Sequence, residues 1–242
     1  MDDARRHDVP PEEEGRDERS RIERVYHAYS ADPHYKKIWS GNAAHFIMER
    51  KWKEITQELR KEGVDIPTAR LLDLGAGDGA DCIRFRQLGF RAERIVAIDL
   101  LRGSVRWAKK SVGWLKVLQA DGARLPFRDG SFEIVYQSTM LSSVLDRERR
   151  RQILLEVGRV LAADGLFLSY DTRYPNPWNR NTSPLSSSEL RSAFHGWRVS
   201  VRSTTPIPQL ARLVGALGRA AWVAIEKVPP LRSHLLAIAR KP

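Results

Sequence analysis

Three glycines at alternate positions, Gly75, Gly77 and Gly79, follow the apolar segment Leu71–Leu74. Glycine has no Cβ atom, so the backbone can turn tightly here and a ligand can lie directly on the amide groups. The next residues, 81–85, are expected to open a helix, whose N-terminal amides favour anionic and polar groups. An apolar strand, a glycine-rich turn and a helix together predict a nucleotide-type cofactor site.

A carboxylate narrows the kind of cofactor. The short apolar run 94–100 contains Asp99, and in βαβ nucleotide-binding units an acid about twenty residues after the glycines accepts hydrogen bonds from ribose hydroxyls. These features alone do not separate NAD from S-adenosylmethionine, because Gly75-x-Gly77-x-x-Ala80 also satisfies the dinucleotide pattern. A third segment is needed to decide between them.

That segment is Val117–Phe127, which contains Asp121 and Gly122, ends in Leu-Pro-Phe and precedes the apolar run Phe132–Tyr136. With these residues the chain resembles the class I S-adenosylmethionine-dependent methyltransferases, from about residue 25 to the C-terminus. The resemblance implies a Rossmann-like, doubly wound, seven-stranded and mostly parallel sheet, with S-adenosylmethionine as cofactor and no metal. The glycine segment would wrap the methionine moiety, the acid after the second strand would hold the ribose, and the third segment would pack around adenine. The cofactor-binding residues predicted in this way are Asp73, Gly75, Ala76, Gly77, Gly79, Asp99, Leu100, Asp121, Gly122 and Gln137.

The N-terminal part divides into two segments. Residues 1–20 contain eight acidic and four basic residues and almost no large apolar ones, which predicts a disordered acidic tail. Residues 21–66 show helical spacing of apolar residues. The resemblance implies that this segment forms a helical lid over the cofactor, with Tyr26 and Trp39 near the acceptor. Residues 67–242 are expected to form the methyltransferase core, with a mostly apolar cover helix near 208–227.

The loop after the fifth predicted strand is the candidate acceptor loop. It runs from Asp171 to residue 181 and places Arg173, Asn176 and Arg180 at the expected rim of the cleft. The loop resembles that of a bacterial methyltransferase subgroup whose members look like enzymes of polysaccharide, glycolipid or secondary-metabolite synthesis. Asp171 is the first candidate for a general base, and a structural role for it is equally compatible with the sequence. His45, in the expected lid, is a second and weaker candidate.

Composition limits the partners. The net charge of +11 is compatible with nucleic acid, an anionic membrane surface or a phosphorylated substrate, but the scattered basic residues favour a solvated surface. The single cysteine, Cys82, allows no intramolecular disulfide. The charged N-terminus does not resemble a signal peptide, and the protein is expected to be cytoplasmic.

The expected reaction is methyl transfer to a hydroxyl, or less readily an amine, of a glycan, glycolipid or small metabolite. Such a displacement depends mainly on alignment and the exclusion of water. A nucleic-acid methyltransferase is the first alternative, although Gln137-Ser138-Thr139-Met140 stands where adenine-N6 enzymes carry an Asn-Pro-Pro-Tyr-like segment. A cofactor-binding partner protein without catalysis, and an NAD-dependent dehydrogenase, remain the other hypotheses.

Overall fold

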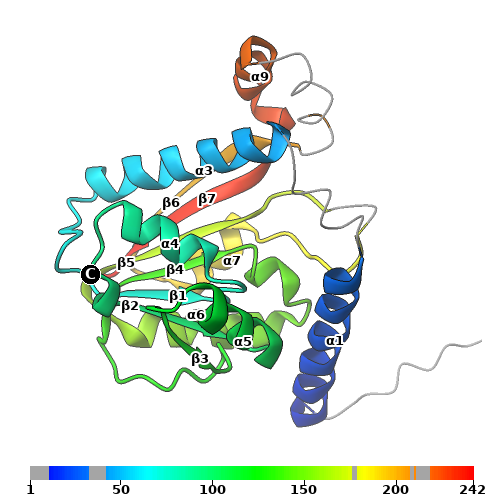
Figure 1. The fold of residues 1–242 in the computed structure, drawn as a ribbon, viewed down its shortest axis with the longest axis vertical. Helices are drawn as coiled ribbons and strands as arrows, with labels where there is room; N and C mark the ends of the chain where they lie inside the picture. The colour runs from blue at the N-terminus through cyan, green and yellow to red at the C-terminus, as the bar shows by residue number, and fades with distance from the viewer. Residues whose placement is uncertain (1–10, 33–41, 176–178, 208–209, 211–218) are drawn as a thin grey trace, which may run out of the picture.

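A seven-stranded sheet forms the centre of the computed structural model, which describes residues 11–32, 42–175, 179–207, 210 and 219–242 (Figure 1). The strands are β1 (Leu71–Leu74), β2 (Ile95–Asp99), β3 (Lys116–Gln119), β4 (Phe132–Ser138), β5 (Leu161–Thr172), β6 (Arg198–Pro206) and β7 (Arg232–Arg240). The helices are α1 (Pro11–Ala31), α3 (Asn42–Lys61), α4 (Ala80–Gln87), α5 (Arg102–Ser111), α6 (Arg147–Val160), α7 (Ser187–Ala193) and α9 (Arg219–Glu226), and the 3-10 turns are η1 (Ala92–Arg94), η2 (Leu141–Ser143) and η3 (Pro229–Leu231).

The strand order is β3-β2-β1-β4-β5-β7-β6. The first five strands in this order run parallel, and β7 lies antiparallel to both β5 and β6. The seven-stranded, mostly parallel sheet predicted from the sequence is therefore confirmed. From β1 the chain builds the sheet in one direction through β2 to β3, and then in the other direction through β4 to β5. In open α/β sheets a crevice forms where the direction changes, at the carboxyl ends of the strands.

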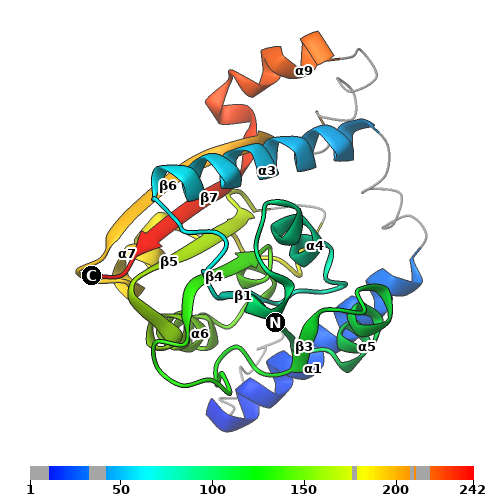
Figure 2. The same ribbon diagram turned by 60° about the vertical axis from the view of Figure 1, so that its left-hand side comes forward.

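Helices cover both faces of the sheet (Figures 1 and 2). On one face α3, α4 and α5 pack on alternate residues of the strands, for example Leu71 and Ile134. On the other face α6 and α7 pack on Leu72 and Val135. Successive strand residues point to opposite faces, so the continuous apolar runs of these strands are what a sheet buried on both sides requires.

Helix α3 belongs to the core and not to a lid, contrary to the prediction for residues 21–66. Its Trp52, Ile55 and Leu59 are buried, and the Trp52 ring meets the Phe85 ring edge to face at a centroid distance of 5.0 Å. Ile55 and Leu59 are fully buried, and each such side chain contributes roughly 2 kcal/mol to stability. A lid that opened would expose this apolar stripe to water, which is why α3 stays on the sheet.

Helix α1 begins ten residues before the predicted boundary, because the expected disordered tail includes residues 11–20, which are helical. Proline is well suited to the first helical position, since its missing N–H has no partner there anyway. Tertiary contacts also hold the helix: Glu18 Oε1 accepts a hydrogen bond from Leu145 N at 2.6 Å, and Arg21 Nη2 donates to Ser143 O at 2.5 Å. Local composition could not reveal these distant partners.

The expected cover helix near 208–227 is described only at residue 210 and from residue 219 onward, as α9. Trp222 of α9 is buried against Ile47 and Phe46 of α3, and Arg219 Nη2 pairs with Glu49 Oε1 at 2.8 Å. Figures 1 and 2 show α9 next to α3, at the end of the molecule opposite α1. The described part of this segment therefore covers α3 and not the crevice. None of the described helices is long and apolar enough to cross a membrane.

Candidate functional site

The glycine turn after β1 is shaped by contacts with β2 and with the loop after β4. Gly75 N and Ala76 N both donate to Ile98 O, at 2.9 and 3.0 Å. Gly75 has a φ of 76°, and a Cβ atom there would lie 2.4 Å from Met140 Cγ. Gly77, at a φ of 57°, has nothing within 4 Å of where its Cβ would be. Gly75 is therefore needed for packing, whereas Gly77 leaves open space above the turn.

Asp99 closes this turn from β2. Its Oδ2 accepts a hydrogen bond from Gly77 N at 2.9 Å, and its Oδ1 accepts one from Leu101 N at 2.8 Å. Burial raises the pKa of the Asp99 carboxyl, although the backbone donors oppose this effect. A carboxylate held by two amides at the carboxyl end of a strand is a fixed acceptor for ligand hydroxyls.

Asp121 lies beyond β3 on the same side. Its Oδ1 accepts from Ala123 N at 2.9 Å, and its Oδ2 pairs with Arg149 Nη2 of α6. A Cβ atom on Gly122 would come 3.3 Å from Leu74 Cδ1, so the backbone passes close to the end of β1. Asp121 is thus held by α6, a partner that the sequence prediction missed.

These three segments surround a cavity of about 860 Å³. The predicted residues that line it are Tyr26, Gly75, Gly77, Asp99, Leu100, Asp121 and Gly122. The cavity is also lined by Ser138 and Ser143, from the end of β4 and the turn after it, where the hydroxyls are compatible with either a ligand contact or helix capping. Further lining residues that were not predicted include Trp107 on α5, Met140 after β4 and Arg149 on α6. Trp107 is 58% exposed. The signal that could have identified it in the sequence is a tryptophan within an otherwise charged helix.

Asp73 lies behind the cavity wall. The carboxylate is 2% exposed and accepts a hydrogen bond from Cys82 Sγ at 3.2 Å. Burial, reinforced by the negative charge of Asp81, raises the pKa of Asp73 to about 7. Ala76 and Gly79 likewise do not line the cavity, so these predicted cofactor residues shape the turn from behind.

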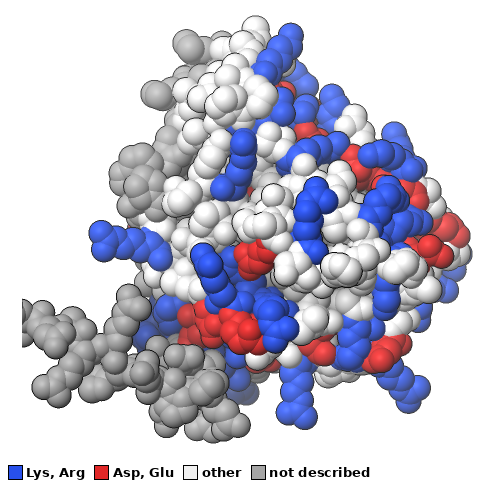
Figure 3. Space-filling view, turned by 180° about the vertical axis from the view of Figure 1, so that it is seen from behind, with Lys and Arg blue, Asp and Glu red and all other residues white. Residues whose placement is uncertain are grey.

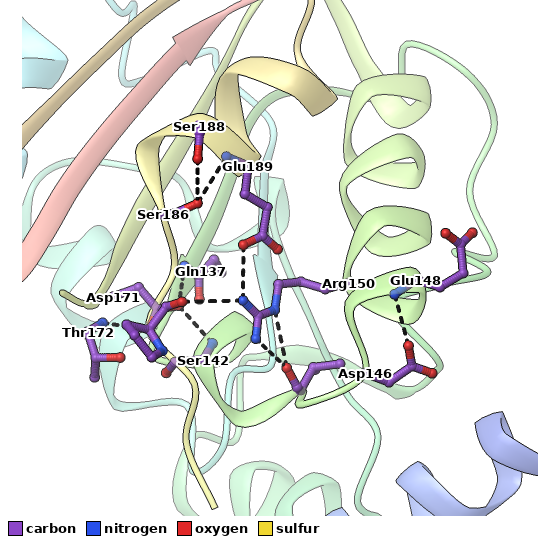
Figure 4. Close-up of polar contacts among 12 residues, drawn as sticks. Gln137, Ser142, Asp146, Glu148, Arg150, Asp171, Thr172, Ser186, Ser188 and Glu189 are labelled. Atoms are coloured by element: carbon purple, nitrogen blue, oxygen red, sulfur yellow. Dashed lines mark hydrogen bonds and ion pairs between the residues drawn. The ribbon is translucent and has the colours of Figure 1, made fainter. Parts of the chain in front are cut away.

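Asp171 does not face the crevice, contrary to the prediction that it is the base there. It is 0% exposed: its Oδ1 accepts from Thr172 N at 2.7 Å and its Oδ2 from Gln137 Nε2 at 3.1 Å and Ser142 N at 3.2 Å. Figure 4 shows this group between β4, β5 and the turn after β4. Burial raises the pKa of Asp171, and the donors oppose this. With donors on both oxygens, the carboxylate has a structural role.

Gln137, predicted to bind the cofactor, is also fully buried. Its Oε1 accepts from Met140 N at 3.0 Å and Leu141 N at 3.3 Å, and its amide donates to Asp171. Nearby, Arg150 of α6 is 1% exposed, donates to Val144 O at 2.6 Å and pairs with Glu189 Oε2 at 3.1 Å (Figure 4). These buried groups hold η2 and the residues after it, and so position Met140 and Ser143 on the cavity wall.

The other predicted acceptor residues are not brought together at the cavity. Arg173 stacks on Tyr174 with a centroid distance of 4.7 Å and donates to Pro229 O at 3.0 Å. Arg180 is exposed and does not line the cavity. His45 lines a different cavity of about 580 Å³, which lies along α3 and includes Arg84 of α4. Trp39 and Asn176 lie outside the described residues.

A buried lysine was missed altogether. Lys51 of α3 is 4% exposed; its Nζ pairs with Asp81 Oδ2 at 2.6 Å and donates to Ser138 Oγ at 3.0 Å. Tyr136 OH also donates to Asp81 Oδ2, at 2.7 Å. The signal was present in the sequence, because Lys51 lies one helical turn from both Ile47 and Ile55, in the apolar stripe of α3.

Comparison with known proteins assigns the fold. Residues 72–169 match the methyltransferase domain family. The chain is 32% identical over 153 residues to a malonyl-[acyl-carrier protein] O-methyltransferase of Geobacter sulfurreducens, covering 62% of this chain and 52% of that protein. It is 27% identical to a demethylmenaquinone methyltransferase of Streptomyces avermitilis, covering 72% of this chain and 78% of that protein. The crystal structure of a SAM-dependent methyltransferase from Archaeoglobus fulgidus superposes with a TM-score of 0.55 at 16% identity, over 81% of this chain and 99% of that one. The chain thus spans about half the length of the first of these relatives.

Proposed function

Because residues 72–169 form a class I S-adenosylmethionine-dependent methyltransferase domain, we propose that the protein transfers a methyl group from this cofactor to an oxygen atom of a small-molecule acceptor. The observation that carries the proposal is the cavity lined by Gly77, Asp99 and Asp121, the residues at the carboxyl ends of β1, β2 and β3. When bound, the cofactor supplies an electrophilic methyl group on a sulfonium.

The donor set in the cavity fits the parts of this cofactor. Asp99, held by two amides, offers carboxylate oxygens to the ribose hydroxyls. Gly77 leaves the backbone accessible to the methionine moiety, and Leu100, Asp121 and Gly122 line the side assigned to adenine. Asp73, Ala76, Gly79 and Gln137 act from behind the wall by holding the turn and the strand ends in place.

We further infer that α1, and not the whole segment 21–66, is the lid. Tyr26 and Ile22 line the cavity from α1. Tyr26 OH and Ser143 Oγ are hydrogen-bonded at 3.0 Å, and Tyr29 OH donates to Asn179 Oδ1 at 3.0 Å. The docking of α1 thus combines these hydrogen bonds with the packing of Ile22 and Tyr26 on the core, and closing it over the site would exclude water from the reaction.

The acceptor proposed here is a small molecule that bears a reactive oxygen. Malonyl-[acyl-carrier protein] O-methyltransferases are among the relatives, which favours oxygen over nitrogen. A hydroxyl of a glycan, glycolipid or secondary metabolite, expected from the sequence, is a second form of the same proposal. The cavity of about 860 Å³ is large enough for the cofactor and a modest acceptor together.

The positive charge gives little support to a nucleic-acid substrate. Figure 3 shows one face of the molecule, on which Lys and Arg are scattered among acidic and uncharged residues. Many basic side chains are paired with acids, as in Arg151 with Glu148 at 2.7 Å and Arg70 with Glu133 at 2.5 Å. The described residues on this face form a surface typical of a solvated protein, without the continuous basic stripe that tracks a phosphate backbone.

Calorimetric titration with S-adenosylhomocysteine, with NAD in parallel, tests the proposal. Gly77→Ala places a methyl group in the open space above the turn and should weaken S-adenosylhomocysteine binding, as should Asp99→Ala. Gly63→Ala is the matched control, because Gly63 has a φ of 67° and nothing within 4 Å of its Cβ position, but does not line the cavity. Both glycine variants should lose about 1 kcal/mol of stability through the left-handed backbone. NAD binding, or equal effects of the two variants on S-adenosylhomocysteine, would contradict the assignment.

Transfer itself is measured with S-adenosylmethionine labelled in the methyl group and two acceptors, malonyl-N-acetylcysteamine and a hydroxylated sugar. Label that becomes base-labile in the first case indicates a methyl ester, and base-stable label in the second indicates an ether. Absence of transfer to both, with S-adenosylhomocysteine bound, would favour the hypothesis of a cofactor-binding partner protein.

A further inference from the structure

The described residues that line the cavity include no group suited to remove a proton from an alcohol. Its acids are Asp78, Asp99 and Asp121, all on the side of β1, β2 and β3 that is assigned to the cofactor. The predicted base, Asp171, is buried and hydrogen-bonded elsewhere, and His45 lines another cavity. An alcohol needs a base when it attacks, because its proton must leave. An acceptor that is already ionised does not.

At the carboxyl end of β4 the cavity wall is hydrogen-bonded to a buried lysine, whose ammonium is paired with Asp81. Ser138 lines the cavity, and its Oγ accepts a hydrogen bond from Lys51 Nζ at 3.0 Å. The ammonium lies 5.2, 5.4 and 5.7 Å from the ring centroids of Tyr170, Trp52 and Tyr136. Aromatic faces and Asp81 thus hold Lys51 in one place, one hydrogen bond behind the wall.

The backbone at this point is strained. Thr139, next to Ser138, has a φ of 53°, which a β-branched residue rarely adopts, and its N–H donates to Tyr170 O at 2.8 Å. Strain of this kind persists only where the surroundings impose it, and it is concentrated at functional sites. Behind this wall His234 stacks on Tyr170, and burial, with the charge of Lys51, lowers the pKa of His234 to about 4.

We propose that Ser138 and Lys51 form an anion subsite that binds the carboxylate of the methyl acceptor, Ser138 by contact and Lys51 as a positioning residue acting through it. The proposal rests on the proposed function and narrows its acceptor from any oxygen to a carboxylate. The ionised carboxylate oxygen forms its bond to the methyl carbon as the carbon–sulfur bond breaks, and the electron pair of that bond remains on sulfur. No proton leaves, so the reaction needs no base.

The main competing role for Lys51 is to bind the carboxylate of the cofactor itself. The two roles differ in what the removal of the charge changes. If Lys51 serves the acceptor, S-adenosylhomocysteine binding should survive its loss, because the residues assigned to the cofactor are untouched. If Lys51 serves the cofactor, the advantage of S-adenosylhomocysteine over 5′-methylthioadenosine, which lacks the amino-acid part, should disappear.

The experiment uses the full chain saturated with S-adenosylhomocysteine and titrates malonyl-N-acetylcysteamine against the analogue whose carboxylate is replaced by a carboxamide. The wild type should prefer the carboxylate by about tenfold or more, the difference expected for a hydrogen bond to a charged group. Lys51→Met should reduce this preference to about threefold or less, and Lys51→Arg should retain most of it. Lys53→Met, on the exposed side of the same helix, is the matched control and should behave as the wild type.

Each outcome decides one question. Equal affinity of the wild type for carboxylate and carboxamide, or a preference unchanged in Lys51→Met, refutes the subsite while leaving cofactor binding intact. If Lys51→Met loses the preference for S-adenosylhomocysteine over 5′-methylthioadenosine, Lys51 binds the cofactor and not the acceptor. This outcome also refutes the subsite. Failure of the wild type to bind S-adenosylhomocysteine refutes the proposed function instead. Thermal unfolding of Lys51→Met shows whether the variant is folded, and Ser138→Ala, which leaves Lys51 in place, should lower the preference independently.

Discussion

Replacing Asp73 by asparagine should stabilise the protein at high pH and have almost no effect at low pH. Asp73 is 2% exposed, and burial raises its pKa from 3.8 to about 7. Between these two values the folded chain holds a proton that the unfolded chain releases. Unfolding therefore becomes easier as the pH rises through this range, and above about pH 7 the full cost of a buried charge remains.

The size of the effect follows from the pKa. Each pKa unit is worth about 1.4 kcal/mol, so the rise in the pKa of Asp73 corresponds to at most about 4 kcal/mol of lost stability. Relaxation of the protein around the charge lowers this cost, and we take about 2 kcal/mol as the lower bound. Asparagine removes the charge and keeps an oxygen that can accept from Cys82 Sγ. Asp73→Asn should thus be more stable than the wild type by roughly 2–4 kcal/mol at pH 8, and the two should converge near pH 4.

Urea unfolding followed by tryptophan fluorescence, at several pH values from 4 to 8.5, measures the difference. The difference between variant and wild type cancels the contribution of the other carboxylates to the pH dependence of stability. Examples are Glu62 and Glu133, whose pKa values are lowered by arginine partners although burial opposes this. Asp164→Asn, at an exposed position near the start of β5 with a φ of 57°, is the control and should give a flat difference. A variant that is less stable at every pH, or a difference that does not grow between pH 4 and 7, would refute the reasoning.

Three further changes test the groups that hold the cavity wall. Asp171→Asn should reduce stability by about 1–3 kcal/mol in urea unfolding, because the asparagine amide turns N–H groups toward donors that now point at a carboxylate oxygen. It should not move the pH dependence of turnover, and a shifted pH profile would restore Asp171 as the base. Arg150→Met should cost about 3 kcal/mol because Glu189 and the Val144 carbonyl lose their buried partner, and an unchanged urea midpoint would count against this. Gly75→Ala should destabilise through contact with Met140, and Met140→Ala should partly relieve this in a double-mutant cycle; strict additivity would contradict the contact.

The strands that surround the cavity could be predicted from the sequence because strand and turn signals are local, and the family resemblance implied the seven-stranded, mostly parallel sheet. The apolar runs that became β1, β2 and β4 fall at the predicted places, and Gly75, Gly77, Asp99, Asp121 and Gly122 meet at the cavity. Residues at the carboxyl ends of neighbouring parallel strands converge wherever the strands pair in this order. Their convergence therefore follows from strand assignment alone.

The acceptor side could not be predicted in the same way. Asp171 was correctly placed at the end of a strand, but whether its side chain enters the crevice or is buried depends on Gln137 and Ser142 from other segments. The lid was wrongly extended to α3, because an amphipathic helix looks the same whether its apolar stripe covers a sheet or a ligand. Lys51 was overlooked because a single charge in such a stripe gives no indication of its partners.

The sequence by itself therefore determined the fold class and which residues line the β1, β2 and β3 side of the cavity, since strand periodicity and a glycine turn act over a few residues. Only the tertiary structure decided that α1 lies over the cavity, that Asp171 is buried and that Lys51 stands behind Ser138. Each of these depends on side chains distant in the chain finding hydrogen-bond or ionic partners during packing. Burial and pairing are properties of the assembled core, and no local pattern encodes them.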